Sequence, residues 1–427
     1  MTRPGYTMTE IGEIPEDWGT SKLSKIFKVF TGTTPSTKIR KYWSNGSIEW
    51  LTPKDLGKMA DSLVIPSSEK KITPEAMKQS GLNLIPEESI LISTRAPVGY
   101  VGVNKPKVTF NQGCKGLVPI EHESTDSSFY AYYLKYMKNF LVSVSSGSTF
   151  KELSKERLTD LDMPIPPFPE QQKIAEILST ADEAIQMVND QITQTERLKK
   201  GLMQTLLTRG IGHTKFRMTE IGEIPEEWST TNIAKSSYIK GRIGWQGLTT
   251  KEYLNSGDYF LVTGTEFIEG KVDWNKCHFV SKERYDQDKN IQLQRGDILV
   301  TKDGTIGKTA LISDLPKPAT LNSGVFVIRP LKNSYFQLYM FYVLQSQVFD
   351  RFIKILRSGS TISHLYQNSF DNFEFPLPSI EEQQKIAEIF TTVDDKLNLL
   401  RNKKEYLEKL KKGLMRELLT GRIRVKV

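Results

Sequence analysis

The sequence predicts an α/β protein in which two pseudo-symmetric mixed α/β domains are separated by a long antiparallel two-helix coiled coil. Three observations predict this fold: an internal repeat, short strand-like runs in each copy, and a heptad pattern that ends each copy. The repeat is clearest where MTEIGEIPEDW at residues 8–18 returns as MTEIGEIPEEW at residues 218–228. GST, EQQKIAEI and LKKGLM also recur, and all the matches are 210–212 residues apart. This spacing is far longer than a solenoid period, so the chain holds two copies of one module.

Each copy begins with a mixed, loop-rich region. In the first copy, strand-like runs at residues 89–93 and 98–103 alternate with turns such as TGTTPS and SNGS, and the second copy has runs at residues 258–263 and 297–301. Aromatic-rich segments at residues 129–140 and 335–352 are predicted helices. Their aromatic residues recur every three or four positions, which favours packing in a core over a platform for base stacking.

Each copy ends in one long helix with a heptad seam. Prolines at residues 164, 166, 167 and 169, and at residues 376 and 378, end the mixed regions and open these helices. The first seam consists of Ile174, Leu178, Ala181, Ile185, Val188, Ile192, Thr195, Lys199, Leu202 and Leu206; its counterpart, 212 residues later, consists of Ile386, Phe390, Val393, Leu397, Leu400, Lys404, Leu407, Lys411, Leu414 and Leu418. The strict heptad period favours pairing of the helices over two helices on a membrane surface, and the polar positions can fix the register.

Connectivity sets the direction of the two helices. The first helix delivers the chain into the second module, so the second helix must run back along the first, with one module at each end. The first helix spans about 57 Å at about 1.5 Å per residue. The chain after the second helix therefore finishes near the first module. The predicted boundaries are residues 1–168 for the first mixed domain, 169–208 for the first helix, 209–217 for a linker, 218–380 for the second mixed domain, and 381–427 for the second helix and a basic tail.

Charge and composition narrow the class of protein. The net charge of +8 suits a polyanionic partner, and residues 396–427 hold eleven Lys or Arg against three Glu, a surplus that equals the charge of the whole chain. Cys114 and Cys277 are the only cysteines and the four histidines are scattered, so we expect neither a disulfide framework nor a metal site. The sequence shows no export signal and no apolar run long enough to span a membrane, so we expect a cytoplasmic protein without a membrane partner.

Motifs for catalysis are missing from the sequence. GTIGKT at residues 304–309 is similar to a phosphate loop, but the GxxxxGK[ST] pattern needs Gly where Lys302 stands. The corresponding loop APVGYVG at residues 96–102 lacks the Lys-Thr, so both loops are better interpreted as turns between strands. There is no GxGxxG, GxSxG or HExxH, and no Asn-Pro-Pro-aromatic loop of adenine methyltransferases. No catalytic residue is therefore predicted.

Polar loops in both modules carry side chains that suit DNA. Arg matches guanine edges, and Asn or Gln matches adenine edges. For any single residue a solvated surface role is the commoner one, so the prediction depends on the clusters in corresponding places of both modules. The predicted DNA-binding residues are Thr33, Ser36, Lys38, Arg40, Lys41, Trp43, Arg95, Asn111 and Gln112 in the first module, and Lys240, Arg242, Trp245, Gln246, Lys302, Asp303, Lys308, Asn322 and Ser323 in the second.

The order of these motifs resembles a known family. A module, a PxPPxxEQQKIAxI helix, a divergent second module, and an EQQKIAEI helix that ends in LKKGLMxxLLT together resemble the specificity subunit of type I restriction-modification enzymes over essentially the whole chain. The resemblance implies a non-catalytic DNA reader with two target-recognition domains. Each domain would bind one half of an asymmetric bipartite sequence in double-stranded DNA. The weak match between the modules fits two sites that read different bases.

The resemblance also implies partners and their cofactors. Modification (methyltransferase) subunits would dock on the helices and supply S-adenosylmethionine for adenine methylation. Restriction (translocase/nuclease) subunits, where they exist, would supply ATP and Mg chemistry, and this chain would bind no cofactor. The candidate partner-binding residues, in the two EQQKIA motifs, are Gln171, Gln172, Lys173, Gln383, Gln384 and Lys385.

Two other classes of function stay open at this level. A catalytic methyltransferase or nuclease would need a cofactor or metal motif, and binding of S-adenosylmethionine by the isolated chain would favour it. A coiled-coil scaffold without a DNA role, in which the duplication serves only stability, would explain the helices but not the paired polar loops. Indifference to duplex DNA would favour the scaffold.

Overall fold

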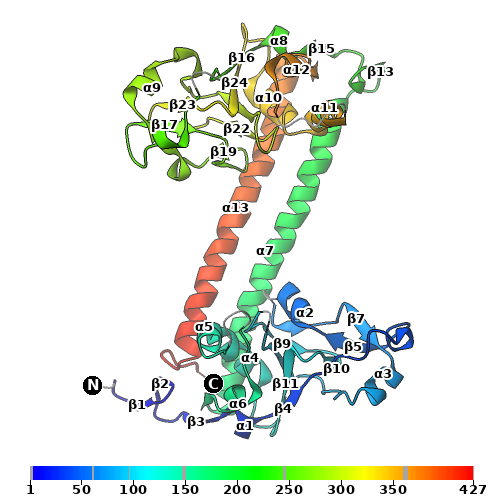
Figure 1. Cartoon of the computed structure of the whole chain (residues 1–427), viewed down its shortest axis with the longest axis vertical. Coiled ribbons are helices and arrows are strands. Elements are labelled where there is room, and N and C mark those ends of the chain that lie inside the picture. The colour runs from blue at the N-terminus through cyan, green and yellow to red at the C-terminus, as the bar shows by residue number, and fades with distance from the viewer. Residues whose placement is uncertain are drawn as a thin grey trace. The chain divides into compact units, whose positions relative to one another are not determined.

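The computed structural model describes residues 3–59, 62–95, 97–146, 151–243, 247–358 and 364–426. It divides into two compact units: unit 1 consists of Met1–Gln191 and Leu400–Val427, and unit 2 consists of Ile192–Leu399. Each unit holds one copy of the repeated module and a part of each long helix, α7 (Phe168–Arg209) and α13 (Ile380–Leu418) (Figure 1). The predicted mixed α/β modules with a long helix pair are confirmed.

The first module, in unit 1, contains more sheet than helix. Its strands are β1 (Tyr6–Thr9), β2 (Gly12–Pro15), β3 (Gly19–Lys22), β4 (Phe27–Thr31), β5 (Ile48–Leu51), β6 (Val64–Ile65), β7 (Lys70–Ile72), β8 (Ile90–Ser93), β9 (Val101–Asn104), β10 (Val108–Phe110), β11 (Cys114–Pro119) and β12 (Asp162–Ile165). Its short helices are α1 (Leu23–Ile26), η1 (Arg40–Tyr42), α2 (Pro53–Lys58), α3 (Pro74–Gln79), α4 (Ser127–Tyr136), α5 (Lys138–Ser143) and α6 (Lys155–Thr159). The strands form sheets in the orders β4-β11-β8-β9-β6 and β10-β5-β7, with the pairs β1-β2 and β12-β3.

The second module, in unit 2, repeats this plan. Its strands are β13 (Phe216–Thr219), β14 (Gly222–Pro225), β15 (Ser229–Asn232), β16 (Ser237–Gly241), β17 (Tyr259–Val262), β18 (Phe267–Ile268), β19 (Lys271–Val272), β20 (His278–Val280), β21 (Ile298–Thr301), β22 (Thr309–Leu311), β23 (Ala319–Leu321), β24 (Val325–Pro330) and β25 (Glu374–Leu377). Its short helices are α8 (Ile233–Ser236), η3 (Thr250–Glu252), η4 (Trp274–Lys276), α9 (Lys282–Asp286), η5 (Lys289–Ile291), α10 (Gln337–Val343), α11 (Gln347–Ser358) and α12 (Gln367–Phe370).

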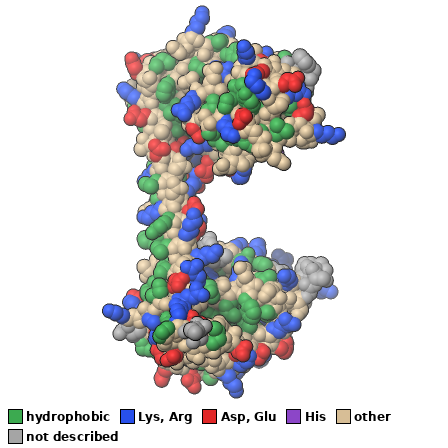
Figure 2. All heavy atoms as spheres, turned by 90° about the vertical axis from the view of Figure 1, so that its left-hand side faces the viewer, with side chains coloured by type: hydrophobic (Ala, Val, Ile, Leu, Met, Phe, Trp, Pro, Cys, Tyr) green, Lys and Arg blue, Asp and Glu red, His purple; other side chains and the backbone are tan. Residues whose placement is uncertain are grey.

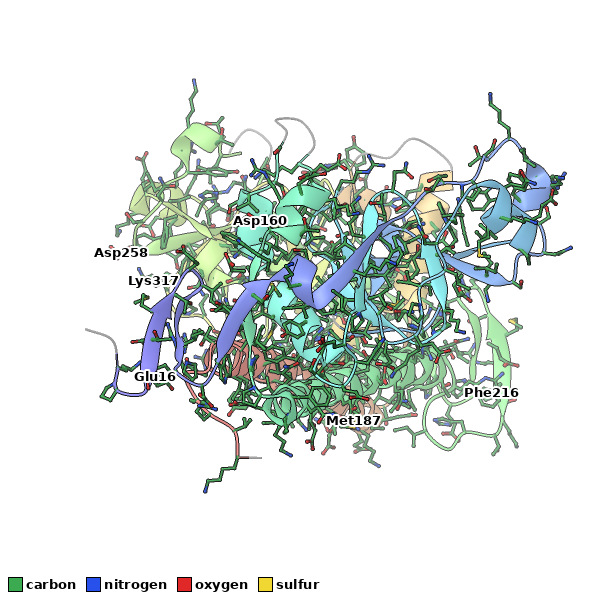
Figure 3. The ribbon with its side chains drawn as sticks, turned by 90° about the horizontal axis from the view of Figure 1, so that it is seen from below. Glu16, Asp160, Met187, Phe216, Asp258 and Lys317 are labelled. Atoms are coloured by element: carbon green, nitrogen blue, oxygen red, sulfur yellow. The ribbon has the colours of Figure 1, made fainter. Side chains whose placement is uncertain are left out.

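The two modules share their sheet topology. The order β16-β24-β21-β22 matches β4-β11-β8-β9, and β23-β17-β20 matches β10-β5-β7. In each three-stranded sheet one outer strand is parallel to the central strand: β10 to β5, and β23 to β17. Asp258 and Lys317, which precede β17 and β23, accordingly lie next to each other in Figure 3. The repeat thus extends to the strand order, except that β6 joins the large sheet of the first module, whereas β18 and β19 of the second module pair with each other.

The predicted strand runs and aromatic helices are explained by burial. All four residues of β8 (ILIS) and of β21 (ILVT) are buried, as expected for strands covered on both faces. Asp126 caps the N-terminus of helix α4, where its side chain accepts a hydrogen bond from the backbone N–H of Phe129. Six consecutive residues of α4, from Phe129 to Leu134, are buried in the core of unit 1. Packing in a core, rather than base stacking, is thus the role of this aromatic segment.

The two long helices pair in opposite directions within each unit. In unit 1, Ile174 and Leu178 near the start of α7 share a core with Leu418 at the end of α13. In unit 2, Leu207 near the end of α7 shares a core with Phe390 near the start of α13. Start meets end in both cases, so the predicted antiparallel pairing is confirmed. Among the described residues, no helix combines the length and apolar character that crossing a membrane requires.

A polar network interrupts the helix seam in unit 1. The hydroxyl of Tyr132 donates a hydrogen bond of 2.7 Å to Asp182 of α7, and the ammonium of Lys411 on α13 bonds the same carboxylate. The Lys411 Nζ atom also lies 5.7 Å from the centre of the Tyr132 ring. Burial, together with the adjacent Asp182 charge, raises the pKa of the Tyr132 hydroxyl, which keeps it a neutral donor.

Unit 2 contains the same network, 212 residues away along the helices. The hydroxyl of Tyr342 donates a 2.9 Å hydrogen bond to Asp394, and Lys199 forms an ion pair of 2.6 Å with that carboxylate. The Lys199 Nζ atom lies 5.6 Å from the Tyr342 ring centre. Two of the polar seam positions are thus paired across the helices, which fixes the register. Lys404, the third lysine of the seam, instead pairs with Glu408 of its own helix at 3.7 Å.

We predict that Asp182→Ala lowers the free energy of unfolding of unit 1 by about 3 kcal/mol, because it leaves the Lys411 charge half-buried without a carboxylate. The Asp182 and Lys411 side chains are only 10% and 15% exposed. The matched variant Asp394→Ala removes a pair whose side chains are 29% and 20% exposed, so its effect should be smaller. Urea unfolding of the full chain measures both. Equal and negligible shifts would show that the networks contribute nothing to stability.

Candidate nucleic-acid interface

Several predicted DNA-binding residues of the first module meet where two core strands end. The backbone N–H of Thr33 donates to the carbonyl of Phe110, the last residue of β10, at 3.0 Å. The Thr34 hydroxyl contacts Gln112 Oε1 at 2.5 Å, and the N–H of Thr94 donates to Gly113 O at 2.8 Å. We call strand-end cluster 1 the set of exposed or partly exposed residues at this place: Thr33, Arg95, Asn111, Gln112 and Glu152.

The second module has an equivalent strand-end site, which is held by equivalent backbone hydrogen bonds. The N–H of Asn322 donates to Val262 O at 2.9 Å, as Asn111 N–H does to Leu51 O at 2.9 Å. The N–H of Lys302 donates to Gly324 O at 2.9 Å, in the position of the Thr94 bond of the first module. Strand-end cluster 2 consists of Lys302, Asp303, Asn322, Ser323 and His364. The structure thus unites predicted residues that lie far apart in the sequence of each module.

The asparagines of the two clusters differ in exposure. Asn322 is 8% exposed, and its carboxamide accepts from Leu248 N–H at 3.3 Å and donates to the Tyr253 hydroxyl. Asn111 is half-buried, and its carboxamide oxygen accepts a 3.0 Å bond from Gly113 N–H. The Asn322 side chain thus holds the segment that contains Leu248 and Tyr253, and the neighbouring Ser323 is more open to a ligand.

The loop before β5 carries exposed basic side chains, and Trp43 packs the loop against the module. Trp43 packs edge-on against Trp50 with ring centres 4.9 Å apart, and its indole N–H donates to Ser36 O at 3.2 Å. Lys38 and Arg40 on this loop are exposed. The remaining predicted cation, Lys41, forms an ion pair with Glu75. Trp43 therefore shapes the loop, while the predicted Lys38 and Arg40 reach solvent.

Arg242, a predicted DNA contact, lies inside the second module. It is 1% exposed, and its guanidinium donates to Leu321 O at 2.8 Å and to Gln287 Oε1 at 3.0 Å. Further bonds reach Arg284 O at 3.3 Å and Thr320 Oγ1 at 3.2 Å. Burial lowers the pKa of this guanidinium. Sequence alone could not reveal this, because a loop arginine that caps strand ends and one that faces solvent have the same local pattern.

The other basic residues of the second module are more open. Lys308 is exposed and Lys240 is half-buried. Lys302 is half-buried with its Nζ atom 4.8 Å from the Phe326 ring centre, and burial lowers the pKa of its ammonium group. The predicted contacts Trp245 and Gln246 lie outside the described residues. GTIGKT forms the turn between β21 and β22, with Thr301 N–H bonded to Lys308 O at 2.9 Å, so the turn interpretation is confirmed.

The EQQKIA motifs at the start of the long helices serve two purposes. Gln171 and Gln383 are each 1% exposed; Gln171 accepts from Asp126 N–H at 3.0 Å, and Gln383 accepts from Phe336 N–H at 2.8 Å. Their amides therefore attach the helices to the modules and are covered from partners. The other four predicted partner-binding residues are exposed or half-buried: Gln172, Lys173, Gln384 and Lys385.

Glutamates of these motifs were not among the predicted residues, although they join distant segments. Glu170 is 2% exposed; it accepts a 2.9 Å hydrogen bond from the Trp18 indole and 2.8 Å bonds from Arg424. In unit 2, Glu382 accepts a 2.9 Å bond from the Trp228 indole. The nearly equal spacing of Trp and Glu, 152 residues in the first copy and 154 in the second, was the available signal. Among the described residues, no cluster of acidic, His or Cys side chains is arranged to hold a metal ion.

Comparison with known proteins agrees with this architecture. A family model described as the type I restriction modification DNA specificity domain matches the chain twice, at residues 15–197 and 243–409. The chain is 28% identical to the type I restriction enzyme MjaIX specificity subunit of Methanocaldococcus jannaschii, over 98% of this chain and 96% of that protein. It is 30% identical to the EcoR124I/EcoR124II specificity subunit of Escherichia coli, over 44% of this chain and 46% of that protein.

A solved structure shares the fold. The S subunit of the type I restriction-modification system from M. genitalium matches 98% of this chain and 99% of its own, with a TM-score of 0.58 at 17% identity. The chain is thus a two-domain protein of the class that supplies DNA specificity rather than catalysis. It belongs to the type I restriction-modification DNA specificity family, as the sequence resemblance implied.

We predict that Arg242→Met destabilises unit 2 by about 2 kcal/mol, because it leaves buried carbonyl and amide acceptors without a donor. Thermal unfolding of the full chain measures the loss. Since Arg242 is buried, any DNA affinity that the variant retains should keep the wild-type sequence preference. A stable variant with an altered preference would show instead that Arg242 contacts DNA.

Proposed function

We propose that the chain is the DNA sequence-specificity subunit of a type I restriction-modification complex and reads a bipartite, asymmetric target with one half-site per module. One observation carries this proposal: the two strand-end clusters use the same backbone bonds but, apart from the asparagine that both contain, different side chains. A common frame suits the common geometry of a DNA duplex, while different donors and acceptors suit different bases. The proposed base contacts are the open residues of the two clusters.

Exposed cations around these clusters support contact with the phosphate backbone. Lys38, Arg40 and Lys308 are exposed, and none has an ion-pair partner among the described residues. Phosphate contacts position a protein on DNA without reading its sequence. Figure 2 shows Lys and Arg side chains spread over the visible face of each unit among acidic ones. The clusters with their neighbouring cations therefore support the proposal better than any single basic patch.

The long helices offer surfaces for protein partners. Exposed large apolar side chains on α7 and α13 include Met187 (61%), Leu198 (53%), Leu399 (69%), Tyr406 (66%) and Leu410 (44%). Met187 is labelled on the ribbon of α7 in Figure 3. Such residues outside the helix seam fit contact with helices of another protein. The proposed partners on these surfaces are modification subunits, with restriction subunits in the complete enzyme.

The chemistry of the complex would reside in these partners. Modification subunits would bind S-adenosylmethionine, and restriction subunits would use ATP and Mg. A complex that uses ATP and S-adenosylmethionine to act on host DNA would work in the cytoplasm. The specificity chain would supply only the position and orientation of the catalytic subunits on the target.

We predict that the purified chain transfers no methyl group to DNA and that methylation of adenine appears when its modification subunit and S-adenosylmethionine are added. Incorporation of labelled methyl groups measures this, with the modification subunit alone as the control. Methyl transfer by the specificity chain alone would contradict the proposal. Methylation without sequence preference in the complete mixture would contradict it equally.

We predict that the affinity for duplex DNA falls log-linearly with salt, because bound Lys and Arg release counterions from the phosphates. Arg40→Gln should weaken binding to all sequences alike and lower the salt slope by about 1 if Arg40 contacts one phosphate. Arg157→Gln, in the same unit but bonded to its own module through Val144 O, is a matched control. Fluorescence anisotropy at several salt concentrations measures both, and a flat salt profile would exclude the phosphate contacts.

A further inference from the structure

Each strand-end cluster contains one pair of facing residues in which a carboxylate side chain meets an arginine or a histidine side chain. In the first module Arg95 and Glu152 form an isolated antiparallel β-bridge, with Arg95 Nη1 4.0 Å from Glu152 Oε2. In the second module Asp303 and His364 form the corresponding bridge, and their side chains are hydrogen-bonded. Glu152 and His364 are 212 residues apart, the spacing of the other repeat matches. Neither residue stood out in the sequence.

The backbone around the two pairs is the same. Leu153 N–H donates to Thr94 O at 2.8 Å, and Leu365 N–H donates to Lys302 O at 2.7 Å. Leu153 and Leu365 are 0% and 1% exposed, so a buried leucine fixes each bridge from below. Residues 95 and 303, and residues 152 and 364, therefore occupy equivalent positions in the two modules. Only their side chains differ.

The side chains of the pairs are open to a ligand. Arg95 is 36% and Glu152 50% exposed; Asp303 is 44% and His364 29% exposed. Exposed pairs of this kind contribute little to stability. The residue two positions after the core strand is the cation Arg95 in the first module. In the second module the residue at this position is the acid Asp303. Stability alone does not require this exchange, because either orientation closes the same bridge.

We propose that these pairs determine which bases each module reads: Arg95 recognises a guanine, and Asp303 recognises the amino group of a cytosine. This inference rests on the proposed function and names the contacts within it. Arginine bonds the two acceptors of guanine in the major groove, whereas a carboxylate accepts from cytosine N4. Glu152 and His364 are positioning residues that hold these two side chains at the cluster. The two modules thus have the same backbone at this place but prefer different bases, because one presents an arginine and the other a carboxylate.

The test uses the full chain in complex with its modification subunit and a library of duplexes with randomised sequence, with methylated positions sequenced. Arg95→Gln should shift one position of one half-site from G·C toward A·T, because glutamine matches adenine. Asp303→Asn should shift one position of the other half-site from C·G toward A·T for the same reason. At each position the preference for the original base pair should fall about 10-fold, which corresponds to about 1.4 kcal/mol.

Matched controls separate a change of specificity from a general change of charge. Arg157→Gln in unit 1 removes a positive charge, as Arg95→Gln does, and Glu283→Gln in unit 2 removes a negative charge, as Asp303→Asn does. Both residues are exposed and lie outside the clusters, so both half-sites should stay as they are. Glu152→Gln should loosen the preference at the Arg95 position without a lower unfolding temperature. If Arg95→Gln or Asp303→Asn does not fold, Arg95→Lys and Asp303→Glu keep the charge but change the geometry, and should weaken the same positions.

The outcomes distinguish the base contacts of Arg95 and Asp303 from the proposed function of the whole chain. Unchanged recognition by both Arg95→Gln and Asp303→Asn would overturn the assignment of the pairs while leaving the specificity subunit intact. Changes of both variants in the same half-site would also overturn it, because the pairs belong to different modules. Absence of any preferred sequence with the wild-type complex would overturn the proposed function itself. Shifts in opposite half-sites would establish the pairs as specificity determinants.

Discussion

A carboxylate at the start of each long helix, buried in Glu170 and half-buried in Glu382, holds the structure together. Glu170 receives the Trp18 indole from the segment between β2 and β3 and the Arg424 guanidinium from the segment after α13, so three distant segments meet at one side chain. Glu382 similarly receives the Trp228 indole, the Ile211 N–H and the His213 ring, at 2.9, 2.9 and 3.0 Å. A buried carboxylate is costly unless such donors satisfy it. The position of each module on its helices therefore depends on this contact.

With that attachment fixed, the rest of each module can vary. The neighbouring glutamines bond loop backbones, and the Tyr–Asp–Lys networks pair the helices further along. All these groups recur in both units, whereas the strand-end clusters share only their asparagine and otherwise differ in side chains. The groups that attach the modules to the helices are the same in both units, whereas the clusters differ. The residues that support the modules are therefore distinct from those proposed to recognise DNA. A module can thus change what it binds without a change in how it is held.

Much of this fold follows from the sequence, because its periods are long and regular. The repeat, the heptad seams and the buried strand runs each depend on spacing that a single sequence displays. The candidate site was predictable only in part. Thr33, Arg95 and Asn111 were identified by residue type, but the bridge from Arg95 to Glu152 depends on a tertiary contact between segments 57 residues apart. The burial of Arg242 likewise depends on acceptors from two other segments, which no local pattern specifies.

The assignment of residues to the two units has a consequence for synthesis of the chain on the ribosome. Unit 2 is one continuous segment, Ile192–Leu399, whereas unit 1 needs Met1–Gln191 together with Leu400–Val427. Since domains fold as units during translation, unit 2 can complete its core while unit 1 still lacks a helix segment. Until Leu418 and Leu419 emerge, Ile174 and Leu178 have an open apolar side. The module made first is therefore the one completed last, and nascent chains halted before residue 400 would expose that apolar surface to chaperones.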